Sequence, residues 1–199
     1  MTGTVEYRGV EDLYYAKVTE DSENAYVTGT PARLAGIATI AKTVASNVEA
    51  HYYDNVPAVV ISSTGADTVT LNVSAIPLDV LADITGQIWD STHGAIIEGP
   101  RAQEHFAIGY RFKRTDNTEV YVWRLKGVFN VPDQTNATED DGTEANGQEL
   151  TFTGIQTTHK FTATGKGARA VAADDALGLA QVSNWFSAVV TPDTITTRA

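Results

Sequence analysis

The stretch "RFKRTDNTEVYVWRLKG", Arg111 to Gly127, is the part of the sequence that best indicates the fold. It holds five of the chain's 14 Lys and Arg residues, although the formal net charge of the whole chain is -11. Basic residues interleaved with Tyr and Trp are typical either of a nucleic-acid platform or of a sheet with one solvated face. The alternation of side chains along the stretch distinguishes between the two.

Two alternating runs flank the polar pair Asp116 and Asn117, a pattern typical of an antiparallel hairpin. The aromatic and aliphatic positions are Ile108, Tyr110 and Phe112 before the turn and Tyr121, Trp123, Leu125 and Phe129 after it. We expect these to form one core face, with Tyr110, Tyr121 and Trp123 as core residues. The opposite face then carries Arg111, Lys113, Arg124 and Lys126, and we expect it to be solvated or to contact another subunit.

Outward from the hairpin, most segments also have strand character. "ADTVTLNVSAI" alternates strictly between apolar and polar residues, and "GVEDLYYAKVTED" and "RLAGIATIAKTVAS" are rich in residues that favour strands. The period changes in "SAIPLDVLADITG", which predicts a short helix from Pro77 to Thr85 with Leu78 and Leu81 in the core. The C-terminal segment 174–199 indicates a second helix entered at Asp174 or Asp175, although its end has strand character.

Two segments are predicted to be long loops within a single domain of residues 1–199. Residues 45–67 are too apolar for a solvated linker, so we expect them to pack on their own domain or on another subunit. Residues 133–149 carry six acids and no cation, which indicates a mobile, solvated excursion.

Composition limits the classes of function. A sequence pI near 4.6 is the opposite of the footprint of a nucleic-acid-binding protein. The chain has no cysteine, no apolar run long enough for a membrane span and no evident signal segment, features that fit folding in a cytosol.

Catalytic motifs are also missing from the sequence. The four histidines have no metal-ligand spacing, "TATGKGARA" lacks the spacing of a phosphate-binding loop, and no nucleophile elbow is present. We therefore expect no enzyme activity, no cofactor and no metal site.

The order of several segments carries a family resemblance. "GVEDLYYAKVTED", "GTPARLAG", "EAHYYDNVPA", "IPLDVLADITG", "FAIGYRFKR", "YVWRLKGVFNVPDQT", "ELTFTG" and "WFSAVV" follow one another from about Gly9 to Pro192. In this order they resemble the major tail proteins of long-tailed, non-contractile phages, especially those of Gram-positive hosts. The acidic insertion near residues 138–147 is longer than that pattern.

The resemblance implies a β-sandwich or barrel-like tail-tube fold of two antiparallel sheets, with a flanking short helix and a long inter-subunit loop. It implies hexameric rings that stack around a tape-measure protein, with tail terminator and tail-tip or distal tail proteins as further partners. Double-stranded DNA would pass through the lumen without specific binding, and no membrane would be involved. The protein would be assembled in the host cytoplasm and reside in the virion tail.

Two sets of residues follow as assembly hypotheses. The loop set is Glu49, Tyr52, Tyr53, Asp54, Val56 and Val59, and the cation set is the four basic residues named above. The alternative is a non-catalytic carbohydrate-binding or adhesive β-sandwich of a virion or cell surface. That alternative predicts a flat platform of exposed Trp89, Trp123 or Trp185.

Overall fold

The computed structural model describes residues 4–53, 55–132 and 147–198. Strands dominate this part of the chain, and α1 is its one α-helix. The elements are β1 (Tyr7–Asp21), β2 (Tyr26–Thr28), β3 (Ala32–Arg33), β4 (Ile37–Tyr53), β5 (Val56–Val73), α1 (Leu78–Thr85), β6 (Ile88–Asp90), β7 (Ala95–Ile97), β8 (His105–Arg114), β9 (Glu119–Phe129), β10 (Gln148–Gly154), β11 (Ala170–Asp174) and the 3-10 helix η1 (Asp175–Leu177).

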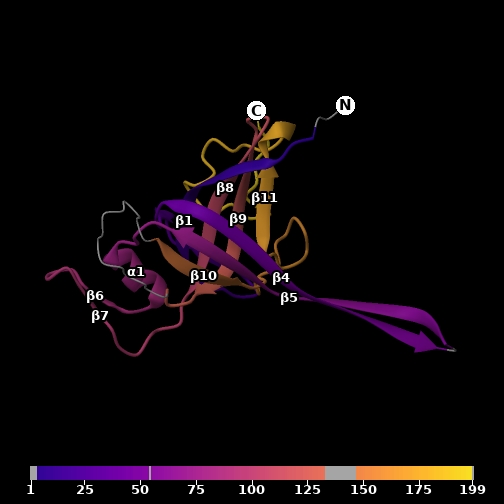
Figure 1. The fold of residues 1–199 in the computed structure, drawn as a ribbon, viewed down its shortest axis with the longest axis horizontal. Helices are drawn as coiled ribbons and strands as arrows, with labels where there is room; N and C mark the ends of the chain where they lie inside the picture. The colour runs from indigo at the N-terminus through magenta and orange to yellow at the C-terminus, as the bar shows by residue number, and fades with distance from the viewer. Residues whose placement is uncertain (1–3, 54, 133–146, 199) are drawn as a thin grey trace, which may run out of the picture.

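The described strands form two antiparallel sheets, as expected. The large sheet has the order β2-β1-β8-β9-β10-β5-β4, with β3 added to β1 and β11 added to β9 (Figure 1). Strand β1 also contacts β4, which lies near the other end of that order, so the sheet curls back towards itself. The small sheet is the β6–β7 hairpin, and α1 lies beside it. The fold is mainly β and sandwich-like, with one flanking helix.

The hairpin predicted around Asp116 and Asn117 is confirmed. Lys113 of β8 is paired with Glu119 of β9, and the residues between them form the turn. Asn117 adopts a left-handed conformation (φ 64°), which Asn tolerates better than most residues. The Asp116 carboxylate accepts a hydrogen bond from the backbone N–H of Thr118 at 3.0 Å, which closes the turn.

The register of this hairpin differs from the prediction. Tyr110 lies opposite Val122, and Gly109 lies opposite Trp123, so the aromatic residues of the two strands face opposite sides of the sheet. Because side chains alternate with a period of two, an offset of one residue is enough to separate them. The prediction of one aromatic face and one solvated basic face is therefore wrong, and both faces of β8–β9 bear a buried cluster.

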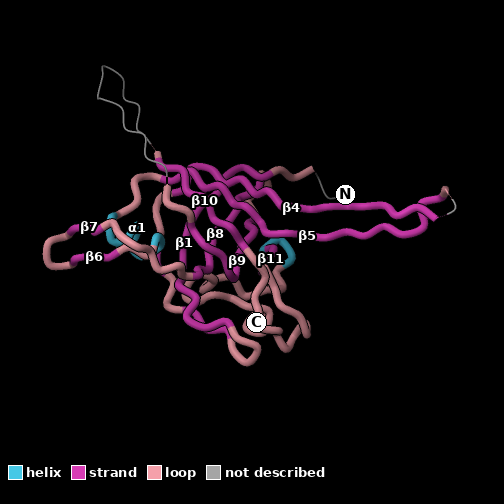
Figure 2. Tube along the Cα trace, turned by 90° about the horizontal axis from the view of Figure 1, so that it is seen from below, coloured by secondary structure: helices cyan, strands magenta, loops and turns pink. Residues whose placement is uncertain are grey.

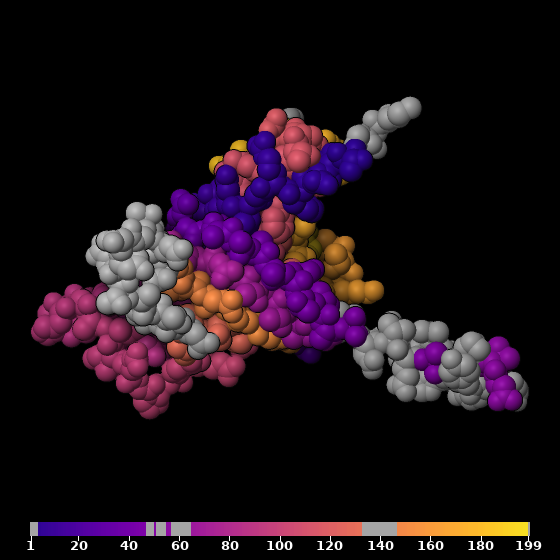
Figure 3. All heavy atoms as spheres, viewed as in Figure 1, coloured from indigo at the N-terminus to yellow at the C-terminus, as the bar shows by residue number. Residues whose placement is uncertain are grey.

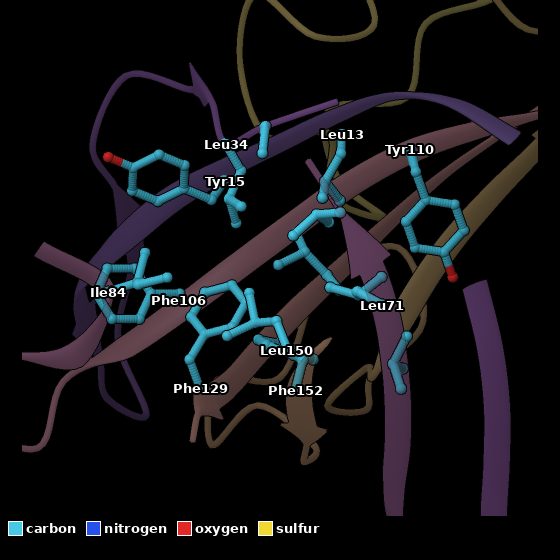
Figure 4. Packing of buried hydrophobic residues seen from close by; sticks show 14 of the residues in the cluster. Leu13, Tyr15, Leu34, Leu71, Ile84, Phe106, Tyr110, Phe129, Leu150 and Phe152 are labelled. Atoms are coloured by element: carbon cyan, nitrogen blue, oxygen red, sulfur yellow. The ribbon is translucent and has the colours of Figure 1, made fainter. Parts of the chain in front are cut away.

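The first cluster fills the concave side of the curled sheet. Figure 4 shows residues from β1, β5, β8, β9, β10 and α1 converging there, among them Leu13, Tyr15, Leu71, Ile84, Phe106, Tyr110, Phe129, Leu150 and Phe152. Phe129 belongs to this side because a register shift between Phe106 and Ile108 of β8 moves the end of β9 to the other face. The rings of Phe129 and Phe152 meet edge to face at 5.1 Å.

The second cluster lies on the opposite face, beneath the C-terminal segment. Trp123 and Leu125 of β9 are fully buried against Trp185 and Val189 of that segment. The indole N–H of Trp123 donates a hydrogen bond to the backbone oxygen of Trp185 at 2.9 Å. Tyr121 belongs to the margin of this cluster and is only half-buried.

The predicted mid-chain helix is confirmed as α1. Gly86 ends it in a left-handed conformation (φ 67°). Leu81 and Ile84 are buried, as an amphipathic helix on a sheet requires. Leu78, however, is 47% exposed, so the prediction that it is a core residue is wrong. It occupies the first position of the helix, and the contact with the core begins one turn later.

The second predicted helix is not present. Asp174 ends β11 and its carboxylate caps the short η1, after which the chain continues in turns up to residue 198. Backbone hydrogen bonds between residues three apart, such as Trp185 N–H to Val182 O at 3.1 Å, hold these turns. The repeated turns place residues three to four apart on one side, which imitates the apolar spacing of a helix.

The two predicted loops have different outcomes. Residues 45–67 are not a loop, because β4 and β5 pair with each other all the way from Ile37↔Val73 to Tyr53↔Val56. Of the predicted acidic excursion, residues 133–146 lie outside the described residues, and Gln148 and Glu149 begin β10.

Candidate functional site

The distal part of the β4–β5 hairpin, which we call the arm (residues 46–64), projects from the body of the molecule. Figures 1 and 2 show it at one end of the longest axis, well beyond the other strands. At a rise of about 3.3 Å per residue, the eight residues from Ser46 to Tyr53 extend for roughly 26 Å. The described side chains along it, Ser46, Ala50, Asn55 and Val56, are exposed. The arm thus holds apolar residues that its own body does not cover.

A β-bulge marks the root of the arm. Val44 is paired with Asp67 and Ser46 with Thr64, so Ala45 alone faces both Gly65 and Ala66. A bulge increases the local twist and bends the strand that carries the extra residue. A side chain at position 65 would press on Ala45, because an added Cβ would lie 3.2 Å from the Ala45 Cβ. The bulge therefore sets the direction in which the arm leaves the body.

A buried ion pair holds the body side of this root. The Arg124 guanidinium donates from Nη1 to Oδ2 of Asp67 at 2.6 Å, and from Nε to the Tyr110 hydroxyl at 3.1 Å. Arg169 reaches the other carboxylate oxygen of Asp67 at 3.5 Å. Burial raises the pKa of Tyr110 more than the neighbouring Arg124 lowers it, so its hydroxyl stays protonated. The cluster connects the start of the arm to the middle of β9.

The remaining basic residues of the opening stretch have acidic partners in their own chain. Arg111 contacts Glu11 at 3.0 Å, Asp12 at 2.7 Å and Glu119 at 2.8 Å. Burial acts to lower the pKa of Arg111, but the hydrogen bond to Glu119 and the charge of Asp12 outweigh it and raise the pKa. Lys113 lies 2.7 Å from Glu11, and this hydrogen bond lowers the pKa of that carboxyl group.

Lys126 lies on the second face, where it contacts Asp21 at 2.5 Å. The Asp21 carboxylate also accepts hydrogen bonds from the backbone N–H groups of Thr158 and His159 at 2.8 and 2.9 Å. Burial acts to raise the pKa of Asp21, but these three donors outweigh it and lower the pKa. The group fastens the end of β1 to the segment that follows β10.

These contacts answer the charge question of the opening stretch. Arg114, the fifth cation of the stretch, contacts Asp174 of β11 at 2.8 Å. The cations are gathered there because acidic residues of β1, β5, β9 and β11 surround them, and together they neutralise each other inside one chain. Arg124 is 5% exposed, so its side chain is not available to another subunit, contrary to the prediction. The side chains of Arg111 (25% exposed), Lys113 (35%) and Lys126 (13%) keep some exposed surface, and their role in subunit contacts stays a prediction.

The predicted assembly residues of the former loop are distributed along the arm. Val56 is 60% exposed at its tip. The backbones of Glu49, Tyr52, Tyr53 and Val59 belong to β4 and β5, whereas their side chains and the whole of Asp54 lie outside what the structure describes. Sequence reasoning did not single out Asp67, Arg169 or Asp12. An aspartate at the start of the "ADTVTLNV" run, in the same phase as Val69 and Leu71, was the one available signal for the first of these.

Other kinds of site have little support. Within the described residues, no group of three or more acidic, His or Cys side chains is arranged to hold a metal ion. No described helix is long and apolar enough to cross a membrane. Trp123 and Trp185 are buried and Trp89 is 36% exposed, so the three do not form a flat aromatic platform.

A comparison with protein families gives the arm a context. A family model described as phage tail tube protein matches residues 21–185, which cover the arm, the core hairpin and α1. The chain belongs to the phage tail tube protein family. The resemblance to phage tail tube proteins noted in the sequence is thereby confirmed, whereas the Gram-positive host stays a prediction. No curated protein is significantly similar to the chain. As a tail tube protein, it is a structural component of the virion tail that assembles with itself and other tail proteins, in a family that is generally non-catalytic.

Proposed function

We propose that the chain polymerises as hexameric rings that stack around a tape-measure protein, and that the resulting tube conducts the genomic DNA during ejection. The observation that carries the proposal is the arm, a long hairpin that leaves the body and whose described side chains are exposed (Figure 1). An apolar ribbon of this kind gains stability when a second copy buries it, at about 25 cal/mol per Å² of apolar surface. Membership of the tail tube family supports a self-contact.

In this proposal the arm bridges to a neighbouring subunit or ring through Glu49, Tyr52, Tyr53, Asp54, Val56 and Val59. The arm is tested by replacing Val48–Ser62 with an Asn-Gly turn. Asn47 and Ser63 are cross-strand partners, so a two-residue turn closes the shortened hairpin without a change of register. None of the described side chains between Val44 and Asp67 belongs to either buried cluster. The shortened protein is expected to melt as the wild type does and to form no tubes by negative-stain microscopy. Tubes of normal length from the shortened protein would refute the role of the arm.

The proposed relation to DNA follows from charge. Six copies at -11 give about -66 formal charges per ring, from 6 × -11, and such a ring repels phosphate wherever its carboxylates face inward. We propose that DNA slides through the tube without binding, and that the exposed parts of Arg111, Lys113 and Lys126 serve subunit contacts.

Duplex binding by assembled tubes tests this relation. Contacts to phosphate produce an affinity that falls with salt, with a slope near -0.9 per contact. We expect no measurable affinity for the wild type at low salt and weaker assembly for Lys113→Ala. Duplex affinity in the wild type that is reduced in Lys113→Ala tubes of normal appearance would mean that this face meets DNA.

A further inference from the structure

The β6–β7 hairpin is a second projecting element, and it lies at the opposite end of the molecule from the arm. Figures 1 and 2 place β6 and β7 at one end of the longest axis and the tip of the β4–β5 hairpin at the other. In the space-filling view of Figure 3 the segment around residues 86–104 stands out from the body. A head-to-tail contact joins two different surfaces of the same chain, and two projections at opposite ends are compatible with such a contact.

The surface of this hairpin is apolar. Ile88 is paired with Ile97, and the two side chains, on one face of the hairpin, are 64% and 51% exposed. Trp89 and Ile96 form the next pair on the other face, where Ile96 packs against the first cluster and Trp89 is 36% exposed. The body therefore covers one face of the hairpin in part and leaves the isoleucine face to the solvent.

The small sheet is also short. It consists of two strands of three residues each, and an isolated two-stranded hairpin is marginally stable in water. Contacts with α1 and the packing of Ile96 hold one side of it. A partner on the isoleucine face would bury those side chains and complete the support of the hairpin.

Charge favours the arm of a second copy as that partner. Charged residues make up 20% of the whole chain. The segment 46–66 has two, Glu49 and Asp54, in 21 residues, and the segment 88–97 has one, Asp90, in ten. Asp90 is occupied locally, because its carboxylate accepts hydrogen bonds from the backbone N–H groups of Thr92 and His93. Few charges must lose water when two such surfaces meet, so an apolar contact between them costs little desolvation.

We propose that the isoleucine face of the β6–β7 hairpin is the receptor for the arm of a second copy of the chain. The inference rests on the proposed role of the arm, and it adds the surface that the arm meets. The contact is heterologous: each copy contributes its arm at one end and its β6–β7 hairpin at the other, so that it propagates from copy to copy.

Cysteine cross-linking tests the contact directly, since the chain has no cysteine of its own. Val56→Cys at the arm tip is combined with Cys at Ile88, Trp89 or Ile97, and the tubes are oxidised. A disulfide needs Cα atoms about 4.4–6.8 Å apart, so it forms only where the two substituted residues lie next to each other. We expect at least one pair to form a ladder of covalent oligomers on a non-reducing gel. The control pair combines Val56→Cys with Leu177→Cys. Leu177 lies on η1 and is 67% exposed, and this pair should form no covalent oligomers. Absence of a ladder from all three hairpin pairs, or a ladder from the control pair alone, would overturn the proposal.

A charge-insertion pair provides the second test. Ile88→Asp/Ile97→Asp is expected to raise the concentration needed for tube formation at least tenfold, with an unchanged far-UV circular dichroism spectrum. Leu177→Asp/Leu179→Asp adds the same charge at two sites that are 67% and 66% exposed, and it should assemble as the wild type does. An effect in both double variants, or in neither, would contradict the receptor role. If the arm-shortened protein loses tubes while Ile88→Asp/Ile97→Asp keeps them, the arm functions through another surface. If the arm-shortened protein forms normal tubes, the proposed function itself fails.

Discussion

Arg124 and Asp67 form an ion pair, 2.6 Å long, in which the two side chains are only 6% and 8% exposed. Asp67 lies at the position where β5 leaves the body to become the arm, and Arg124 lies in the middle of β9. The pair therefore joins the middle of β9, inside the large sheet, to the base of the arm.

Removal of one member of this pair is expected to destabilise the fold. Asp67→Asn leaves the Arg124 guanidinium buried without its counter-charge, and such a loss costs about 3–5 kcal/mol. Urea denaturation monitored by tryptophan fluorescence measures the change in the free energy of unfolding. The matched control is Asp175→Asn, because the Asp175–Arg198 pair is longer, 3.3 Å, and more exposed. That variant should lose no more than about 1 kcal/mol. Equal losses of unfolding free energy in the two variants would show that burial does not increase the contribution of the Asp67 pair to stability.

The two sides of the sheet can be tested with three truncations. Trp123→Ala should cost about 3–5 kcal/mol and Leu81→Ala about 2–5 kcal/mol, because both remove buried side chains. Leu78→Ala, in the same helix as Leu81, should change stability by less than about 0.5 kcal/mol because Leu78 is exposed. Thermal melting ranks the three variants by their loss of stability. A loss in Leu78→Ala as large as that in Leu81→Ala would place the first turn of α1 in the core after all.

The close approach of β8 to the Trp123 ring predicts that Gly109 tolerates no side chain. An added Cβ would lie 2.9 Å from three atoms of the indole, whose N–H is held by the Trp185 backbone oxygen. Gly109→Ala is therefore expected to cost about 1–3 kcal/mol through overpacking. Gly9→Ala, also in a strand of the large sheet, has open space around its Cβ and serves as the control. A Gly109→Ala variant as stable as Gly9→Ala would mean that the indole moves aside freely.

The lowered pKa of Asp21 predicts a dependence of stability on pH. Because its pKa is lower in the folded state than in the unfolded chain, at about 3.9, Asp21 contributes its full stabilisation above that value. The contribution is lost as the pH falls through the lowered folded pKa. The difference in unfolding free energy between the wild type and Asp21→Asn should therefore be constant from about pH 6 to 8 and shrink below about pH 4. A difference that stays constant down to pH 3 would exclude this linkage.

The sequence was informative wherever one side of an element meets the core. Strict alternation in "ADTVTLNVSAI" predicts β5, and the spacing in "IPLDVLADITG" predicts α1, because in each case a buried face imposes a period. None of the described side chains of the arm belongs to a buried cluster. Its segment "VASNVEAHYYDNVPAVVISS" consequently lacks a clear period of two, and it was interpreted as a loop although it is a hairpin.

The register between paired strands is also not predicted by the sequence patterns. The alternation of each strand identifies Tyr110 and Trp123 as inward-facing, but the pairing of Gly109 with Trp123 decides that they face opposite clusters. The same pairing places Arg124 beside Tyr110 and within reach of Asp67. Apart from Glu119, which is eight residues from Arg111, the ion-pair partners come from strands 57 to 105 residues away in the chain. Local patterns carry no information about such distances.

The continuity of β4 and β5 from the arm into the large sheet has a mechanical consequence. A pull on the arm tip along its own axis acts parallel to the strands, so the hydrogen bonds of the β4–β5 and β5–β10 ladders share the load instead of opening one after another. A sideways force meets no such resistance, and it concentrates where the ladder is interrupted, at the bulge beside Gly65 and between His51 and Tyr52. A tube built from these arms would be stiff under tension and would yield to bending at a few defined points in each copy.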